Sequence, residues 1–197
     1  MAVAGSVRRF DAIDAAWLTE TLATAGVLPS GRVVGVERES CGHGLLSDAY
    51  RFELTYEQPG AGPASVVGKF ASDDPTSREF GRQSGQYRNE VFFYQELASN
   101  LDVAIPTPIY AALAENQTDF VLLMDDLAPA RSVDQLVGCT PDEAALATEQ
   151  CAALHAGTSH SGSAVTSCCE STFPRDRGAP PVNEEAGRKR QSPGARG

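Results

Sequence analysis

Near Ala156 the composition of this chain changes abruptly, and the change limits where a folded core can form. Residues 157–197 contain no Leu, Ile, Met, Trp or Tyr and are rich in Gly, Ser, Pro and Arg. Such a segment buries too little apolar surface to offset the backbone entropy lost on ordering, about 1 to 2 kcal/mol per residue. We therefore expect the core to come from residues 1–156 and predict a disordered tail over residues 157–197.

The charge of the chain divides at the same place. Residues 1–156 carry 22 Asp and Glu against 10 Lys and Arg, residues 157–197 carry 4 against 6, and the formal net charge is −10. An acidic body disfavours broad contact with a phosphate backbone, so we expect no nucleic-acid partner. No apolar run approaches the length of a membrane span, so we expect no membrane partner either.

The cysteines and histidines point away from metal binding and secretion. The five Cys form no CxxC pair, and there are only three His, which excludes the usual zinc-ligand spacings. The odd number of Cys and the absence of a charged segment followed by an apolar one argue against a secreted, disulfide-linked protein. We expect a reduced, cytoplasmic protein.

Hydrophobic spacing predicts an α+β fold within residues 1–156. Apolar residues at intervals of three and four predict helices over residues 8–28, 86–99 and 141–155. Alternating or continuous apolar segments, separated by Gly and Pro, predict two strands and a turn within 33–56, and further strands within 62–72, 106–113 and 120–124. Residues 75–85 read as a loop.

Lys69 is the first candidate for chemistry. Residues 1–156 contain nine Arg and one Lys, and this Lys lies at the end of the apolar strand Ser-Val-Val-Gly-Lys-Phe. Lysine is a compact point charge suited to a phosphate group, and a strand would hold it in place. The alternative is an edge lysine whose ammonium group reaches solvent.

Glu90 is the expected partner of Lys69. Its neighbours at i+3, i+4 and i+7 in the predicted helix are apolar: Phe93, Tyr94 and Leu97. The carboxylate therefore projects from an apolar face, where an unpaired charge would cost several kcal/mol or become protonated. We predict an ion pair between Glu90 and Lys69; contact with water or with Arg88 is the alternative.

A glycine-containing turn precedes the lysine strand. The segment Cys-Gly-His-Gly-Leu-Leu-Ser at 41–47 joins two predicted strands. Glycines let a backbone approach a ligand closely, and successive N–H groups can face phosphate oxygens. Two glycines alone describe a plain hairpin equally well. The order of glycine turn, strand Lys and helix Glu is what indicates a phosphate site.

These motifs, together with Phe-Val-Leu-Leu-Met-Asp-Asp-Leu at 120–127 and a helix ending in Ala-Leu-His-Ala, resemble known kinases of small molecules. Roughly residues 33–156 resemble the N-terminal lobe and linker of the aminoglycoside-phosphotransferase and ecdysteroid-kinase-like families. The resemblance implies a protein-kinase-like lobe, in which a helix packs on an antiparallel sheet. It also implies ATP as cofactor, with Mg in full-length relatives, and a nucleotide and a small-molecule acceptor as partners.

The resemblance also implies roles for individual residues. Those expected over or against the ATP phosphates are Gly42, Gly44, Ser47 and Lys69. Glu90 would orient Lys69. Those expected in the hinge, where backbone groups meet adenine, are Met124, Asp125 and Asp126. The families often have Glu where Asp125 stands.

The second lobe that the resemblance requires has no counterpart in the sequence. An HGD-type catalytic loop and a metal-binding Asp should follow the last helix, but His155 is followed by Ala-Gly, and Asp176 has no apolar neighbours. We therefore expect a kinase-like lobe at 1–127, a linker with the first helix of a truncated second lobe at 128–156, and the tail at 157–197. We expect no catalytic residue and no appreciable kinase activity.

Three interpretations stay open from the sequence. The chain is a truncated product of an ATP-dependent small-molecule phosphotransferase gene, whose complete relatives transfer the γ-phosphate to a hydroxyl group. Alternatively, it is a catalytically inactive module that binds a nucleotide or a protein. In the third interpretation the resemblance misleads, and the chain is an unrelated α+β protein.

Overall fold

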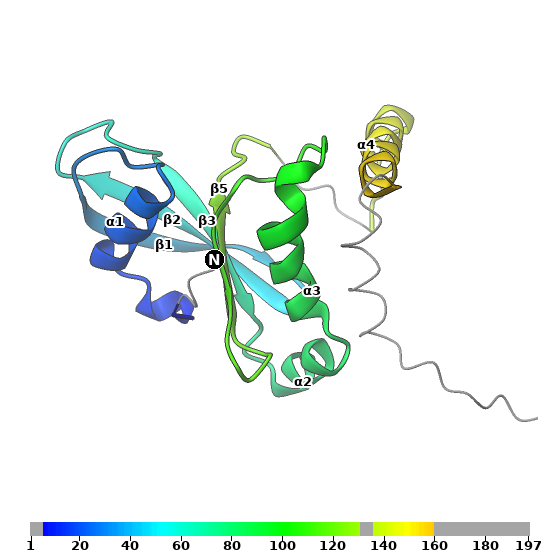
Figure 1. The fold of residues 1–197 in the computed structure, drawn as a ribbon, viewed down its shortest axis with the longest axis horizontal. Helices are drawn as coiled ribbons and strands as arrows, with labels where there is room; N and C mark the ends of the chain where they lie inside the picture. The colour runs from blue at the N-terminus through cyan, green and yellow to red at the C-terminus, as the bar shows by residue number, and fades with distance from the viewer. Residues whose placement is uncertain (1–5, 131–135, 160–197) are drawn as a thin grey trace, which may run out of the picture.

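A computed structural model of the chain describes residues 6–130 and 136–159 (Figure 1). The predicted tail from residue 160 onwards and residues 131–135 of the predicted linker lie outside the described residues. Helices and strands are mixed along the chain, and the predicted α+β class is confirmed. In the described part of the chain, no helix has both the length and the apolar character needed to cross a membrane.

All the described strands belong to one antiparallel sheet. The sheet has five strands in the order β1-β2-β3-β5-β4. Their bounds are β1 Val33–His43, β2 Ser47–Tyr56, β3 Ser65–Ala71, β4 Pro108–Leu113 and β5 Phe120–Asp125. The third strand is therefore central, between β2 and β5. Figure 1 shows α1 on one side of this sheet and α3 on the other.

The first helix is shorter than the sequence predicted. A 3-10 turn, Phe10–Ala12, comes first, Ile13 is extended, and α1 then runs over Ala15–Thr24. The helix begins where it does because the Asp14 side chain accepts a hydrogen bond from the backbone N–H of Trp17 at 2.8 Å. The single helix predicted over residues 8–28 was wrong at its N-terminal end, where this cap separates two elements.

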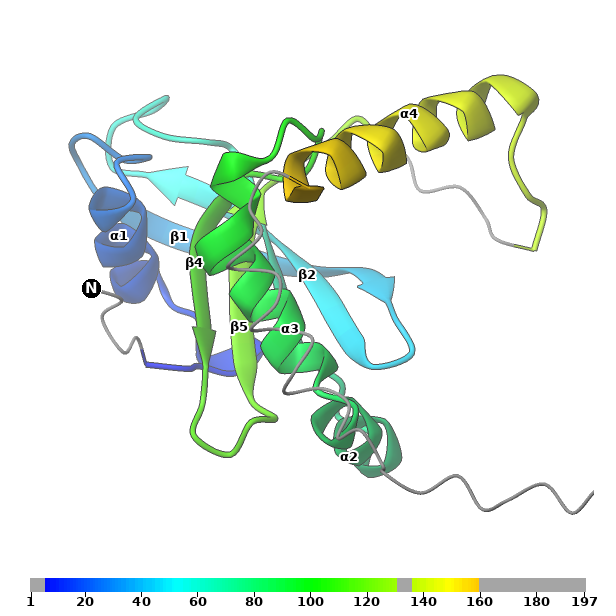
Figure 2. The ribbon, with the colours of Figure 1, turned by 45° about the vertical axis from the view of Figure 1, so that its right-hand side comes forward.

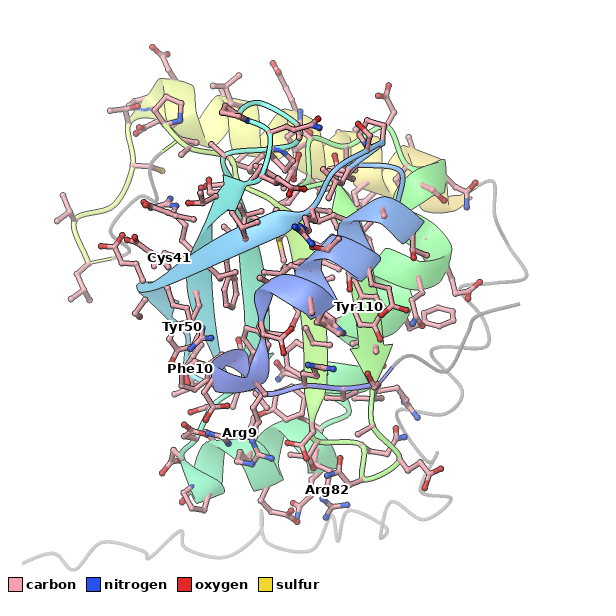
Figure 3. The ribbon with its side chains drawn as sticks, turned by 90° about the vertical axis from the view of Figure 1, so that its left-hand side faces the viewer. Arg9, Phe10, Cys41, Tyr50, Arg82 and Tyr110 are labelled. Carbon is pink, nitrogen blue, oxygen red and sulfur yellow. The ribbon has the colours of Figure 1, made fainter. Side chains whose placement is uncertain are left out.

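The core lies mainly between α1 and the sheet. On this face Phe10 stacks on Tyr50, with ring centroids 4.1 Å apart (Figure 3). The fully or nearly fully buried members of this cluster include Ile13, Leu18, Leu22, Phe52, Val66, Phe70, Val121 and Leu123. Gly68 leaves room for two of the rings, because a β-carbon there would lie 2.8 Å from both Phe52 and Phe70.

Two further helices follow β3, only one of which was predicted: α3 covers the opposite face of the sheet, and α2 packs on α3. α2, Pro75–Gln83, occupies the segment that read as a loop. Asp74 caps it by accepting the N–H of Ser77 at 2.7 Å, and Pro75 occupies the first turn. Figure 2 shows α2 next to the N-terminal end of α3. The Asp-Pro pair was the signal for this helix.

The predicted helix over residues 86–99 is present, with a change of helix type along its length. α3, Gln86–Phe92, continues as a π-helical turn, Phe93–Leu97, and a 3-10 turn, Ala98–Asn100. A second apolar cluster joins α3 to the sheet and contains Tyr87, Val91, Phe120, Leu122 and Met124. Alternate residues of β5 thus pack on opposite faces of the sheet.

The last helix makes few contacts with the rest of the chain. α4, Pro141–Ser159, includes the predicted helix and continues past Ala156, so the disorder predicted from residue 157 was wrong for residues 157–159. Most of its side chains are exposed, including that of Leu146 at 63%. Its middle is joined to the segment after α3 by a hydrogen bond of 2.8 Å from the Ala104 N–H to Gln150 Oε1.

Candidate functional site

The structure brings Lys69 and Glu90 together. Lys69 lies in the central strand β3 and points to the α3 face, where its Nζ is 2.5 Å from Glu90 Oε1. The two side chains are 32% and 29% exposed, so the pair lies at the edge of the apolar cluster and is open to solvent. The predicted ion pair is confirmed. The alternative of an edge lysine is wrong, because β3 is a central strand, while the exposure of Glu90 means that the paired carboxylate also reaches water.

The glycine turn is tighter than the sequence predicted. β1 continues through Gly42, which pairs with Ala49 of β2, and only residues 44–46 separate the two strands. The turn is closed by a hydrogen bond of 2.8 Å from the Gly44 N–H to Ser47 O. A β-carbon at Gly44 would lie 2.9 Å from that same oxygen, which explains the glycine.

The carbonyl of Leu46, the residue before Ser47, connects the hairpin to the rest of the site. Leu46 O accepts the backbone N–H of Ser72 at 3.0 Å and the hydroxyl of Tyr87 at 2.7 Å. Ser72 follows β3, and Tyr87 lies in the first turn of α3. The tip of the β1–β2 hairpin is therefore held against both elements that supply the ion pair.

A pocket opens between these elements. Its volume is about 280 Å³, close to the lower end of the range for small-molecule sites. It is lined by Leu45, Leu46, Ser47, Lys69, Phe80, Gln86, Tyr87 and Glu90. Among these lining residues Lys69 is the one cation, and the ion pair forms part of the wall. The arrangement suits an anion that enters from solvent and meets an ammonium group already held in position.

Only some of the predicted phosphate-site residues line this pocket. Ser47, Lys69 and Glu90 line it. Gly42 lies in β1, in the same cross-strand row as Lys69, because Ala49 pairs with both residues. Gly44 closes the turn without lining the pocket, and its N–H is engaged within the hairpin.

The predicted hinge residues lie apart from this pocket. Met124 is buried against the α3 cluster and pairs with Val67 of β3. Asp125 is joined to Thr107, whose backbone N–H donates to Asp125 Oδ1 at 2.6 Å. None of the three hinge residues is among those that line the pocket around Lys69. They follow Leu122, the residue of β5 that pairs with Lys69, and Asp126 lies just after the end of that strand.

Asp126 has a set of protein partners of its own. Its carboxylate accepts from Arg51 Nε at 2.6 Å, from the Ser65 hydroxyl at 2.7 Å and from the Ala128 N–H at 3.0 Å. The hydrogen bond from Arg51 is the main reason that the pKa of Asp126 is lowered to about 2. Asp126 thus fastens the end of β5 to β2 and β3.

Sequence reasoning missed Leu46 and Tyr87. A signal for Tyr87 was present, because it precedes Glu90 by three residues and so lies on the same side of the helix. The carbonyl of Leu46 had no signal, since any residue supplies a backbone oxygen. Within residues 6–130 and 136–159, no group of three or more His, Cys, Asp or Glu comes together as a metal site.

Comparisons with known proteins add no assignment to this geometry. A scan of the sequence against protein-family models found no match. A search of curated proteins found no relative. The function is therefore inferred from the site itself.

Proposed function

We propose that this chain binds the phosphate groups of ATP in the pocket between the β1–β2 turn, β3 and α3. The ion pair between Lys69 and Glu90, next to a glycine hairpin, is the observation that carries the proposal. In protein kinases a Gly-rich loop covers the phosphates, a Lys on the third strand binds them, and a Glu on a helix orients that Lys. The same three parts occur here in the same order along the chain.

Stability alone is a weak explanation for this ion pair. Each side chain is close to one-third exposed, and pairs at exposed positions contribute only about 0 to 1 kcal/mol. An ammonium group has three N–H donors, and the bond to Glu90 uses one. Lys69 can therefore keep its partner and still donate to an anion in the pocket.

The sheet next to Lys69 offers a surface for the base of the nucleotide. Ala49 and Val67 belong to the strands that carry the site, lie on the same face as Lys69, and are only half-buried. Met124 pairs with Val67 at the far side of this surface. An adenine ring lying on these apolar side chains would direct its polar edge toward residues 124–126, the proposed hinge.

The reaction that such a site would serve is phosphoryl transfer. Enzymes of the aminoglycoside-phosphotransferase and ecdysteroid-kinase-like families, which the sequence resembles, transfer the γ-phosphate of ATP to a hydroxyl group of a small molecule. We propose this as the parent reaction of the site. Lys69 would contribute by neutralising phosphate charge, with Glu90 fixing its direction. We assign no metal ligands among the described residues.

The test is whether ATP stabilises the chain through Lys69. A ligand that binds the folded state raises its melting temperature, by an amount that corresponds to about 2.7 kcal/mol at 100 times the dissociation constant. We expect ATP to raise the melting temperature of the full chain, Lys69→Ala to abolish the rise, and Glu90→Gln to reduce it.

A matched control removes a cation elsewhere on the sheet. Arg32 forms an exposed ion pair with Glu57, with a distance of 2.8 Å, at the other end of β1. Arg32→Ala should leave the effect of ATP intact. The proposal is wrong if ATP fails to stabilise the wild-type chain, or if Lys69→Ala and Arg32→Ala respond to ATP alike.

A further inference from the structure

The hydroxyl group of Tyr87 connects the glycine turn to the helix that carries Glu90. Tyr87 lies in the first turn of α3 and is 2% exposed. Its hydroxyl group donates to Leu46 O at 2.7 Å, and Ser77 O lies farther away at 3.3 Å. A phenol has a single proton to donate, so the shorter contact with the turn is the main hydrogen bond.

The ring of Tyr87 is held so that its hydroxyl stays at the turn. It packs on Phe120, with ring centroids 5.2 Å apart. The ring also lies so close to Gly81 in α2 that a β-carbon there would overlap it. Because Phe120 and Gly81 both pack against the ring, the position of the hydroxyl is fixed, and its hydrogen bond links α3 to the hairpin.

Tyr87 and Glu90 lie three residues apart in α3, on the side that faces the sheet. One helix therefore sets two positions at once: that of Lys69 through Glu90, and that of the turn through Tyr87. Leu46, whose carbonyl is held, is followed directly by Ser47, which lines the pocket with Lys69. The distance across the pocket depends on both contacts.

We propose that Tyr87 is a positioning residue that holds the β1–β2 turn over Lys69, so that both meet the phosphates of one nucleotide. This inference rests on the proposed function. Tyr87 lines the pocket, but its hydroxyl is engaged with Leu46 O and would act through the turn and through α3 without binding a phosphate. Its contribution should therefore appear with ligands that carry phosphates and disappear with ligands that lack them.

The chain contains a matched control for this role. Tyr56 is also buried, and its hydroxyl donates to a backbone carbonyl, that of Pro63, at 2.9 Å. This bond lies at the opposite end of the β2–β3 hairpin from the glycine turn. If Tyr87 were merely a core tyrosine with a satisfied hydroxyl, Tyr87→Phe and Tyr56→Phe would have the same consequences.

The first measurement compares ATP with adenosine, which shares the base and ribose but has no phosphate, by calorimetry on the full chain. We expect Tyr87→Phe to weaken ATP binding by about three- to tenfold, the usual effect of losing one hydrogen bond, and to leave adenosine unchanged. Tyr56→Phe should change neither. Equal weakening of ATP and adenosine, or equal effects of the two variants on ATP, would overturn the proposal.

The second measurement needs no nucleotide. Hydrogen exchange of the peptide covering residues 41–50 should be faster in Tyr87→Phe than in the wild-type chain and in Tyr56→Phe, because the turn has lost a support. Unchanged exchange would overturn the proposal. If the wild-type chain binds no ATP, the proposed function fails on its own, and exchange alone then decides whether Tyr87 holds the turn.

Discussion

The two faces of the sheet differ in what covers them. On the α1 face, Phe52 and Val66 have no exposed surface, and the aromatic rings pack against one another. On the α3 face of the same strands, Val67 and Lys69 are only half-buried, and a pocket reaches the strand itself. Because neighbouring residues of a strand point to opposite faces, β3 can serve the core and the pocket at once.

This difference implies a functional division between the alternate residues of a strand, which point to opposite faces of the sheet. Substitutions on the α1 face should act on the free energy of unfolding, and substitutions on the α3 face near Lys69 should act on ligand binding. The division can be tested residue by residue.

The largest effect is expected on the α1 face. Phe52→Ala removes a fully buried ring and should lower the free energy of unfolding by about 3 to 5 kcal/mol. Chemical denaturation monitored by circular dichroism measures this. Leu45→Ala, at a side chain that is 83% exposed in the turn, should stay within about 0.5 kcal/mol of the wild-type value. Similar losses for the two variants would contradict the division.

Asp126 should make stability depend on acid pH. Its pKa is about 2 in the folded chain and 3.8 for an unperturbed group, so the folded state favours the ionised form. The resulting stabilisation, about 2 kcal/mol, is fully present above pH 4 and is lost as the pH falls toward 2. Denaturation at a series of pH values measures it.

The matching variant is Asp126→Asn, which cannot ionise. It should be less stable than the wild-type chain at pH 7, because Arg51 and Ser65 lose a charged acceptor. The difference between the two proteins should shrink as the pH is lowered from 4 to 2. A constant difference over this range would mean that Asp126 does not contribute through its charge.

Alanine substitutions at two glycines of the hairpin should change the free energy of unfolding by smaller, and different, amounts. Gly44→Ala forces a β-carbon toward Ser47 O and should cost about 1 to 2 kcal/mol, because backbone must move. At Gly42 a β-carbon would make an ordinary contact of 3.7 Å with Ala49, so Gly42→Ala should be nearly neutral for stability. Thermal denaturation of the two variants checks this; equal losses would show that the turn is not closed as described.

The smallest effect on stability is expected at the ion pair. In a double-mutant cycle with Lys69→Met and Glu90→Gln, the coupling energy should be less than about 1 kcal/mol, since both side chains are partly exposed. Denaturation of the four proteins gives the coupling. A coupling energy well above this limit would mean that the pair mainly stabilises the fold, and the two faces of the sheet would then not differ in function as described.

The sequence predicted the structure correctly where local periodicity determines it. The alternation around Lys69 and the helical spacing around Glu90 predicted the two elements, and the burial cost of a lone carboxylate predicted their ion pair. These are arguments about single residues and their immediate neighbours, and they need no knowledge of how distant segments pack.

Features that depend on tertiary contacts were missed or misplaced. β1 extends through Gly42 because pairing with Ala49 continues to the turn, and glycine propensity alone suggested an earlier end to the strand. Asp126 was assigned only to a hinge, since nothing in the sequence indicated that Arg51, 75 residues away, would bind it. The start of α2 at Asp74 was local and could have been found.

Gly68 has a consequence for how relatives of this chain could be identified. Two phenylalanine rings fill the space where its side chain would be, so a larger residue at this position is compatible with the sheet only if Phe52 or Phe70 becomes smaller. These three positions should therefore vary together among homologous sequences. A search that scores the lysine strand together with residues 52 and 70 would separate true homologues from chains that share the strand motif by chance.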